Sequence, residues 1–258
     1  MDADDGKYLA DTLRLLQQAD AWAVRINGDS PGLQPAPHSP LWRDDDKAHP
    51  YQLSNAAWLL LGSAVDHLGA LQALLHDAKV IPRSAPYTLV RAGLENACGA
   101  VWLLRPPKRT ERLARRLRLA TADVKQREQA RQMISQPGPR TEQECLDEIR
   151  DIAKRAGLAA AALKDRATYT EIVQTVDQSE PDIDIQTIWK VCSAFSHGDM
   201  WATLGWSQQT QVSKTAQPGI AALRVEADLR LLTLAAATAV RVTQVGWRLY
   251  DERSRSPY

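Results

Sequence analysis

The stretch "SAPYTLVRAGLENACGAVWLL", residues 84–104, decides the fold class. Pro86 stands where the first turn of a helix tolerates proline, whereas Pro106 and Pro107 follow the stretch and cannot continue a helix. Most residues between these prolines are apolar. The stretch therefore predicts a helix that packs centrally in a helical protein.

The preceding segment, 51–79, is nearly apolar on all sides over most of its length, which predicts a second helix buried among others. Its longest apolar run, 56–65, is ended by Asp66 and His67 and is far shorter than the roughly 20 residues of a membrane span. The N-terminus is acidic, unlike a secretory signal. We therefore expect a cytoplasmic protein that does not bind membranes.

Six further segments complete the predicted architecture, and one of them opens with Thr141 and Glu144 at the spacing of a capping box. They are predicted as helices over 3–24, 109–131, 141–162, 168–178, 183–196 and 221–252. A Pro-rich stretch at 27–50 and a polar stretch at 207–219 are predicted as loops. Alternating Val, Ile and Thr runs are essentially missing. We expect a single all-α domain over 1–258, a bundle of four to five long helices with short appended helices.

Composition excludes little by itself. With 258 residues, 44% of them hydrophobic, the chain can bury a sizeable core. A net charge of +1 argues neither for nor against a polyanionic partner. The three cysteines are far apart and lack C-x-x-C spacing, which disfavours a disulfide framework or a thiolate zinc site and predicts buried thiols.

Several enzyme classes are disfavoured by motifs that the sequence lacks. It has no phosphate-binding loop of the G-x-x-x-x-G-K-[ST] type, no strand-borne G-x-G-x-x-G and no serine elbow of the α/β-hydrolases. The paired Glu-x-x-His motifs of di-metal bundles are also missing. His67, Glu95 and His197 could serve a single metal, but no spacing selects them. We expect neither a cofactor nor a metal.

Arg91 and Glu95 are the first candidate site residues. Four positions apart on the helix predicted over 84–104, they share one face and can form a charge-assisted pair. The pair could fix the register of the helices, bind an anion or act in catalysis. Of Asp66 and His67, adjacent on the other central helix, one is expected to face inward, and Asp66 is a candidate for substrate binding.

A second candidate region is "WKVCSAFSHGDMW", residues 189–201. Lys190, Ser193 and His197 share one face of the predicted helix that ends here. Gly198 supplies the left-handed residue on which many helices end, and Asp199 can stabilise or orient the imidazole. His197 is therefore either a residue that ends a helix or an acid–base group.

A third candidate is a basic segment. Between residues 105 and 131, ten Lys and Arg residues stand against three Asp and Glu residues. Arg109, Arg112 and Arg116 lie along one edge of an apolar stripe, where they could hold phosphate oxygens. The alternative is a solvated charged face.

The order of "VRAGLENACGAVWLL" on a central helix and "SAFSHGDMW" at the end of a later one resembles uncharacterised bacterial all-helical proteins related to the HEPN (higher eukaryotes and prokaryotes nucleotide-binding) superfamily. The resemblance covers roughly 55–200. Many HEPN proteins are dimeric, metal-independent ribonucleases of toxin and phage-defence systems, with an arginine, four to six residues and then a histidine as their motif.

The resemblance implies that His197 is the catalytic histidine. Lys190 stands where the family has arginine, and a lysine cannot copy the bidentate grip of a guanidinium. Arg91, positioned by Glu95, is the arginine that could replace it in space. The resemblance implies a homodimer that binds or cleaves RNA or nucleotides. The alternative is a non-catalytic interaction module, for dimerisation or as the antidote of a defence pair, in which these residues are structural.

Overall fold

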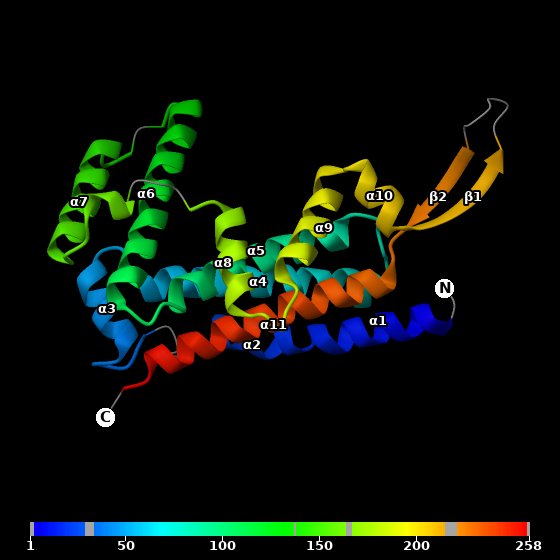
Figure 1. Cartoon of the computed structure of the whole chain (residues 1–258), viewed down its shortest axis with the longest axis horizontal. Helices are drawn as coiled ribbons and strands as arrows, with labels where there is room; N and C mark the ends of the chain where they lie inside the picture. Colours follow the sequence, from blue (N-terminus) through cyan, green and yellow to red (C-terminus); the bar gives the residue numbers. More distant parts are fainter. Residues whose placement is uncertain (1–2, 29–33, 137, 164–166, 215–220, 257–258) are drawn as a thin grey trace. The chain divides into compact units, whose positions relative to one another are not determined.

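In the computed structural model, the residues described are 3–28, 34–136, 138–163, 167–214 and 221–256. Apart from one two-stranded sheet, the regular elements in these ranges are helices (Figure 1), which confirms the predicted all-α class. The longest have 20 to 26 residues and are α4 (Leu53–His76), α5 (Ala85–Leu104), α6 (Arg109–Met133) and α11 (Leu229–Ser254).

The backbone divides into two compact units. Unit 1 comprises residues 1–29, 62–98 and 176–244, and unit 2 comprises 30–61, 99–175 and 245–258. The boundaries fall inside α4, α5 and α11, so each of these helices contributes one part to each unit. That the chain is one domain stays a prediction.

Unit 1 contains α1 (Ala3–Leu16), α2 (Gln18–Asn27), α9 (Ile185–His197) and α10 (Met200–Trp206). The single helix predicted over 3–24 is divided at Gln17, and nothing in the side chains there explains the break. In the core of the unit, the rings of Tyr87 and Phe195 stack with their centroids 4.2 Å apart. The Tyr87 hydroxyl donates to the backbone oxygen of Asp228 at 2.9 Å. The stack holds α5 against α9, and the hydrogen bond joins α5 to the residue that precedes α11.

Unit 2 contains α3 (Pro40–Ala48), α7 (Glu142–Arg155) and a 3-10 helix, η2 (Ala160–Leu163). The capping box predicted at the start of α7 is confirmed, because the Thr141 and Glu144 side chains each accept from the other's backbone N–H. The helix α8 (Tyr169–Ser179) begins in unit 2 and ends in unit 1.

The prediction of a loop over 27–50 is wrong at α3. Ser39 caps this helix, since its hydroxyl accepts from the Trp42 backbone N–H at 3.1 Å, and Pro40 occupies the first helical position. Pro40 therefore marks the start of α3, although the prolines of this stretch predicted a loop. The part of the predicted loop at 29–33 lies outside the described residues.

The prediction of a polar loop over 207–219 is also wrong in part. Strand β1 (Gln208–Lys214) pairs antiparallel with β2 (Ala221–Glu226), and this hairpin follows α10 (Figure 1). Because the pairing satisfies backbone groups, it can form with few apolar side chains. The remainder of the predicted loop, 215–219, lies outside the described residues. The helix predicted from 221 begins instead at Leu229. The carboxylate of the preceding residue, Asp228, accepts from the Leu231 N–H at 2.8 Å.

Helix α4 is less enclosed than predicted. Leu61, Leu68 and Leu71 are fully buried, whereas Leu59 is 69% exposed and Asp66 is exposed. By length and apolar composition alone, α4 could cross a membrane, contrary to the expectation that Asp66 and His67 prevent this. About a third of its most apolar window (33%) is buried in the protein.

Candidate functional site

Four side chains of unit 1 meet in what we call the Arg91 cluster. Arg91 Nε donates to Glu95 Oε1 at 2.9 Å, which confirms the predicted pair on α5. The same oxygen accepts from the Trp189 indole N–H at 2.8 Å. Arg91 Nη1 lies 3.4 Å from His197 Nε2 on α9. A carboxylate held by an indole thus orients a guanidinium that contacts an imidazole.

Local structure explains why these side chains meet. Arg91 lies one helical turn after Tyr87, whose ring stacks on Phe195 two residues before His197. The stack therefore brings one face of α5 to the end of α9. Gly198, at φ 75°, ends α9 in the left-handed conformation that was predicted. The imidazole stands at this helix end and is exposed.

The cluster is open and not fully bonded. The side chains of Arg91 and Glu95 are 24% and 12% exposed. A guanidinium only donates, so in a hydrogen bond between these two groups Nε2 of His197 is the acceptor. At 3.4 Å the contact is longer than an ordinary hydrogen bond, so a ligand can replace it. Within the described ranges, Nη2 of Arg91 has no hydrogen-bond partner.

The other residues predicted for this site do not join the cluster by a hydrogen bond or ion pair within the described part of the chain. Lys190 and Asp199 are exposed, and Ser193 is half-buried. Asp199 is the N-cap residue of α10, but its side chain makes no capping bond. Asp66 is exposed on α4, and its neighbour His67 is half-buried, with its Cβ 3.6 Å from the place that a Cβ on Gly93 would occupy.

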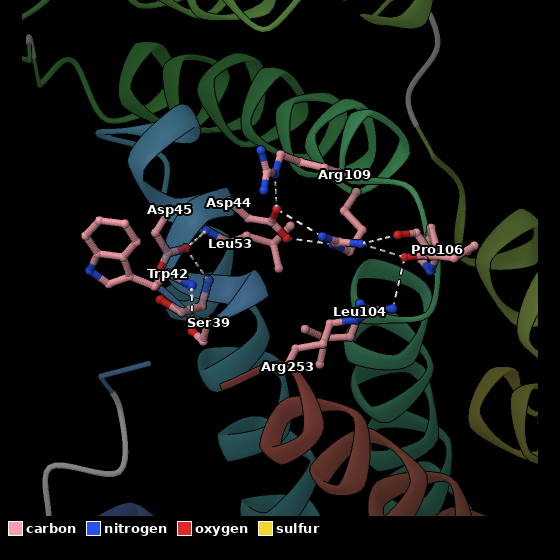
Figure 2. A network of polar contacts seen from close by, with 12 residues as sticks. Ser39, Trp42, Asp44, Asp45, Leu53, Leu104, Pro106, Arg109 and Arg253 are labelled. Atoms are coloured by element: carbon pink, nitrogen blue, oxygen red, sulfur yellow. Dashed lines mark hydrogen bonds and ion pairs between the residues drawn. The ribbon is translucent and has the colours of Figure 1, made fainter. Parts of the chain in front are cut away.

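The predicted phosphate-binding row on α6 has a different role at its centre. Arg112 is 3% exposed and donates to both oxygens of Asp44, at 2.6 and 3.0 Å. Asp44, which is labelled in Figure 2, is fully buried. Its Nη1 donates to the carbonyls of Pro106 and Pro107, each at 2.9 Å. Four of its five N–H groups are thereby used. The fifth N–H belongs to a side chain that is only 3% exposed, so a substrate phosphate cannot reach it, and the prediction of Arg112 as a substrate ligand is corrected.

The two neighbours of Arg112 are also engaged. Arg109 Nε donates to Asp44 at 3.2 Å, although the side chain is 41% exposed. Arg116 Nε donates to the Gln52 carbonyl at 3.1 Å. Burial lowers the pKa of the Arg116 guanidinium. The row therefore mainly fastens α6 to other parts of unit 2.

Further arginines of the basic helix bind the protein itself. Arg115 donates to the Trp102 carbonyl and to Glu111, and Arg118 donates to both oxygens of Glu171. Both guanidinium groups lie over the Trp102 ring. Over this part of α6, the arginines that make up the charge excess supply intramolecular hydrogen bonds.

Trp189 is the residue of the cluster that sequence reasoning missed. It opens the stretch that carries His197, and its position on α9 lies at the edge of the face that Lys190, Ser193 and His197 share. This position was the one sequence signal that could have suggested Trp189 as a site residue. That its N–H points at Glu95, 94 residues earlier, depends on tertiary packing.

The cysteines are free and buried, as predicted. Burial raises the pKa of the Cys192 thiol to about 12 and also raises that of Cys98. In the described ranges, no three His, Cys, Asp or Glu side chains lie close enough together to hold a metal ion.

Comparisons with protein-family models, with curated proteins and with solved structures found no match for this chain.

Proposed function

We propose that this protein binds RNA and cleaves it without a metal ion, in the manner of HEPN-like ribonucleases. His197 is the general acid–base group, Arg91 is the phosphate ligand and Glu95 positions Arg91. One observation carries the proposal: an exposed imidazole lies 3.4 Å from a guanidinium that a carboxylate holds in place. Acid–base and phosphate-binding groups are the two that RNA cleavage requires.

In this proposal the imidazole of His197 acts as the base. Neutral His197 accepts the proton of a ribose 2′-hydroxyl at Nε2, and the 2′-oxygen attacks the adjacent phosphorus. The bond from phosphorus to the 5′-oxygen breaks, and that oxygen takes a proton from water. The products are a 2′,3′-cyclic phosphate and a 5′-hydroxyl. Arg91 stabilises the negative charge that develops on the phosphoryl oxygens.

Lys190 has a secondary role in this proposal. It shares a face of α9 with His197, and its exposed ammonium can bind a neighbouring phosphate as a point charge. Because Arg91 supplies the planar guanidinium, the lysine at the family's arginine position does not remove phosphate binding. Arg91 thus takes over a role that the family assigns to a residue of the same helix as the histidine.

The test is cleavage of labelled single-stranded RNA in the presence of EDTA. We expect the wild-type protein to cut the strand and leave a 2′,3′-cyclic phosphate, and His197→Ala to be slower by at least about 100-fold. His76→Ala is the matched control, because His76 is an exposed histidine of unit 1 that pairs with Asp77. Equal cutting by His197→Ala and wild type, or no cutting by either, would contradict the proposal.

A second candidate function is a non-catalytic interaction module. It is favoured by the exposed apolar side chains of α10, where Met200 is 74% exposed, because such surfaces often mark protein interfaces. In that case the Arg91 cluster only fixes α5 against α9. An unchanged RNA affinity in Arg91→Ala and a partner-dependent change in assembly would support it.

A further inference from the structure

Helix α10 presents apolar side chains to solvent directly after the proposed catalytic histidine. Met200, Trp201 and Leu204 are 74%, 48% and 47% exposed. At 100° per residue these three positions fall within one 100° sector of the helix, so they form a single face. Ala202 on the other side is fully buried and anchors the helix. The exposed face therefore belongs to a helix that is itself packed in place.

The chain keeps this face close to the Arg91 cluster. Only Gly198, Asp199 and Met200 separate His197 from Trp201. Four residues span at most about 14 Å even when fully extended, and the left-handed turn at Gly198 shortens this reach. Figure 1 shows α10 continuing from the end of α9. A strand whose phosphate lies at Arg91 and His197 can therefore place a nearby base on α10.

We propose that Trp201 is a stacking platform for an unpaired base, and that the substrate of the site is single-stranded RNA. This inference rests on the proposed function of the Arg91 cluster. Trp201 is 48% exposed, and an exposed indole can stack on a base of any kind. Bases in a duplex are already stacked and paired, so they cannot use this ring without being extruded. Arg91 and Lys190 supply the phosphate contacts that accompany stacking in single-strand binding sites.

The test measures the affinity of three RNA probes for a protein that cannot cut them. The protein carries His197→Ala, and the probes are a short labelled single strand, the same sequence as a duplex, and a strand of equal length whose sugars lack bases. Fluorescence anisotropy gives the dissociation constant of each. The abasic strand keeps the phosphates and removes the stacking, so it separates the two contributions.

We expect Trp201→Ala to weaken binding of the single strand by about 5- to 100-fold and to leave binding of the abasic strand unchanged. Trp201→Phe should keep most of the affinity, because phenylalanine retains an aromatic face. Trp42→Ala, which removes a similarly exposed indole in unit 2, is the control and should bind like the parent. The duplex should bind more weakly than the single strand.

The outcomes separate the two proposals. If the parent binds the single strand and Arg91→Ala weakens it but Trp201→Ala does not, the stacking inference is wrong and the Arg91 site stands. If Arg91→Ala leaves the affinity unchanged, the proposed site fails and takes this inference with it. If Trp201→Ala changes only the mass of the assembly in light scattering, α10 is a protein interface and the stacking inference is overturned.

Discussion

In unit 2, Arg112 donates to both oxygens of Asp44 and to two carbonyls. The side chains of Arg112 and Asp44 are 3% and 0% exposed. In unit 1, Arg91 donates to one oxygen of Glu95, keeps donors unused within the described ranges and reaches an exposed histidine. Both are arginine–carboxylate pairs with short contacts. The number of donors in use and the access of solvent separate a structural arginine from one available to a ligand.

The surroundings of Arg112 explain why it is buried. Helix α5 ends at Leu104, and Pro106 and Pro107 bring no N–H groups that could continue its hydrogen bonds, so the carbonyls from Leu104 to Pro107 need other donors. Arg253 donates to the carbonyls of Leu104, Arg105 and Pro106 (Figure 2), and Arg112 donates to those of Pro106 and Pro107. Asp44 then balances the charge of Arg112. This network ties α3, α5, α6 and α11 together within unit 2.

The largest expected effect is on stability. Arg112→Ala leaves the Asp44 carboxylate buried without its main partner, which should lower the free energy of unfolding by about 3–5 kcal/mol. Arg91→Ala removes a half-open pair and should cost less than about 1 kcal/mol. Urea denaturation followed by tryptophan fluorescence measures both. Equal losses in the two variants would remove the distinction between the pairs.

Trp189→Phe tests the Arg91 cluster by removing one of its hydrogen bonds. Phenylalanine keeps the packing of the ring but cannot donate to Glu95, so Arg91 should lose its fixed orientation. We expect the rate of RNA cleavage to fall by about 10-fold, the equivalent of one hydrogen bond. The unfolding free energy should change by less than the 3–5 kcal/mol expected for Arg112→Ala.

The rate of RNA cleavage at saturating RNA distinguishes positioning from a purely structural role of Trp189, because a purely structural role would leave this rate unchanged in Trp189→Phe. If Trp189→Phe lowers stability and leaves this rate unchanged, Trp189 does not position the site. A conserved rate in Glu95→Gln, which keeps an oxygen acceptor, would be consistent with positioning by hydrogen bonds alone.

Ser39→Ala tests how firmly α3 presents Asp44. The substitution removes the acceptor for the Trp42 N–H at the start of α3 and should cost about 1 kcal/mol of unfolding free energy. Ser63→Ala is the control, since Ser63 is exposed in the interior of α4. RNA cleavage should be the same in both variants. A loss of cleavage in Ser39→Ala would mean that the Asp44 network also serves the site.

The smallest effect concerns pH. Asp45 accepts from the backbone N–H groups of Leu53 and Ser54 at the start of α4, and its burial raises its pKa above the ordinary 3.8. The Asp45 carboxyl therefore binds its proton more tightly in the folded protein than in the unfolded chain. The free energy of unfolding falls as pH rises from the ordinary pKa to the raised one. The amide introduced by Asp45→Asn does not titrate, so the unfolding free energy of this variant relative to that of wild type should increase as pH rises from below 3.8 through the raised pKa. A constant difference across this range would contradict the raised pKa.

Sequence patterns could predict the parts of this protein that depend on local spacing. The prolines around 84–104 bounded α5, the four-residue spacing of Arg91 and Glu95 predicted their pair, and Gly198 predicted the end of α9. These features need only helical geometry.

Features that depend on distant partners could not be predicted. Asp44 lies 68 residues before Arg112, so no spacing rule links them, and Asp44 was hidden in a stretch that its prolines marked as a loop. The pairing of β1 with β2 likewise depends on backbone groups and not on a pattern of side chains. The arginines of α6 showed a charge excess, but their carbonyl and carboxylate partners are known only from the fold.

The most direct test of the comparison is the salt dependence of RNA binding, measured in the non-cutting His197→Ala protein. If Arg91 binds a phosphate, Arg91→Ala should reduce the slope of log affinity against log salt concentration by about 0.7, the value of one phosphate contact on a single strand. Arg14→Ala, which removes an exposed guanidinium paired with Asp11, should leave the slope unchanged. An identical slope in the Arg91→Ala protein would contradict the account, because it would show that Arg91, like Arg112, binds no phosphate.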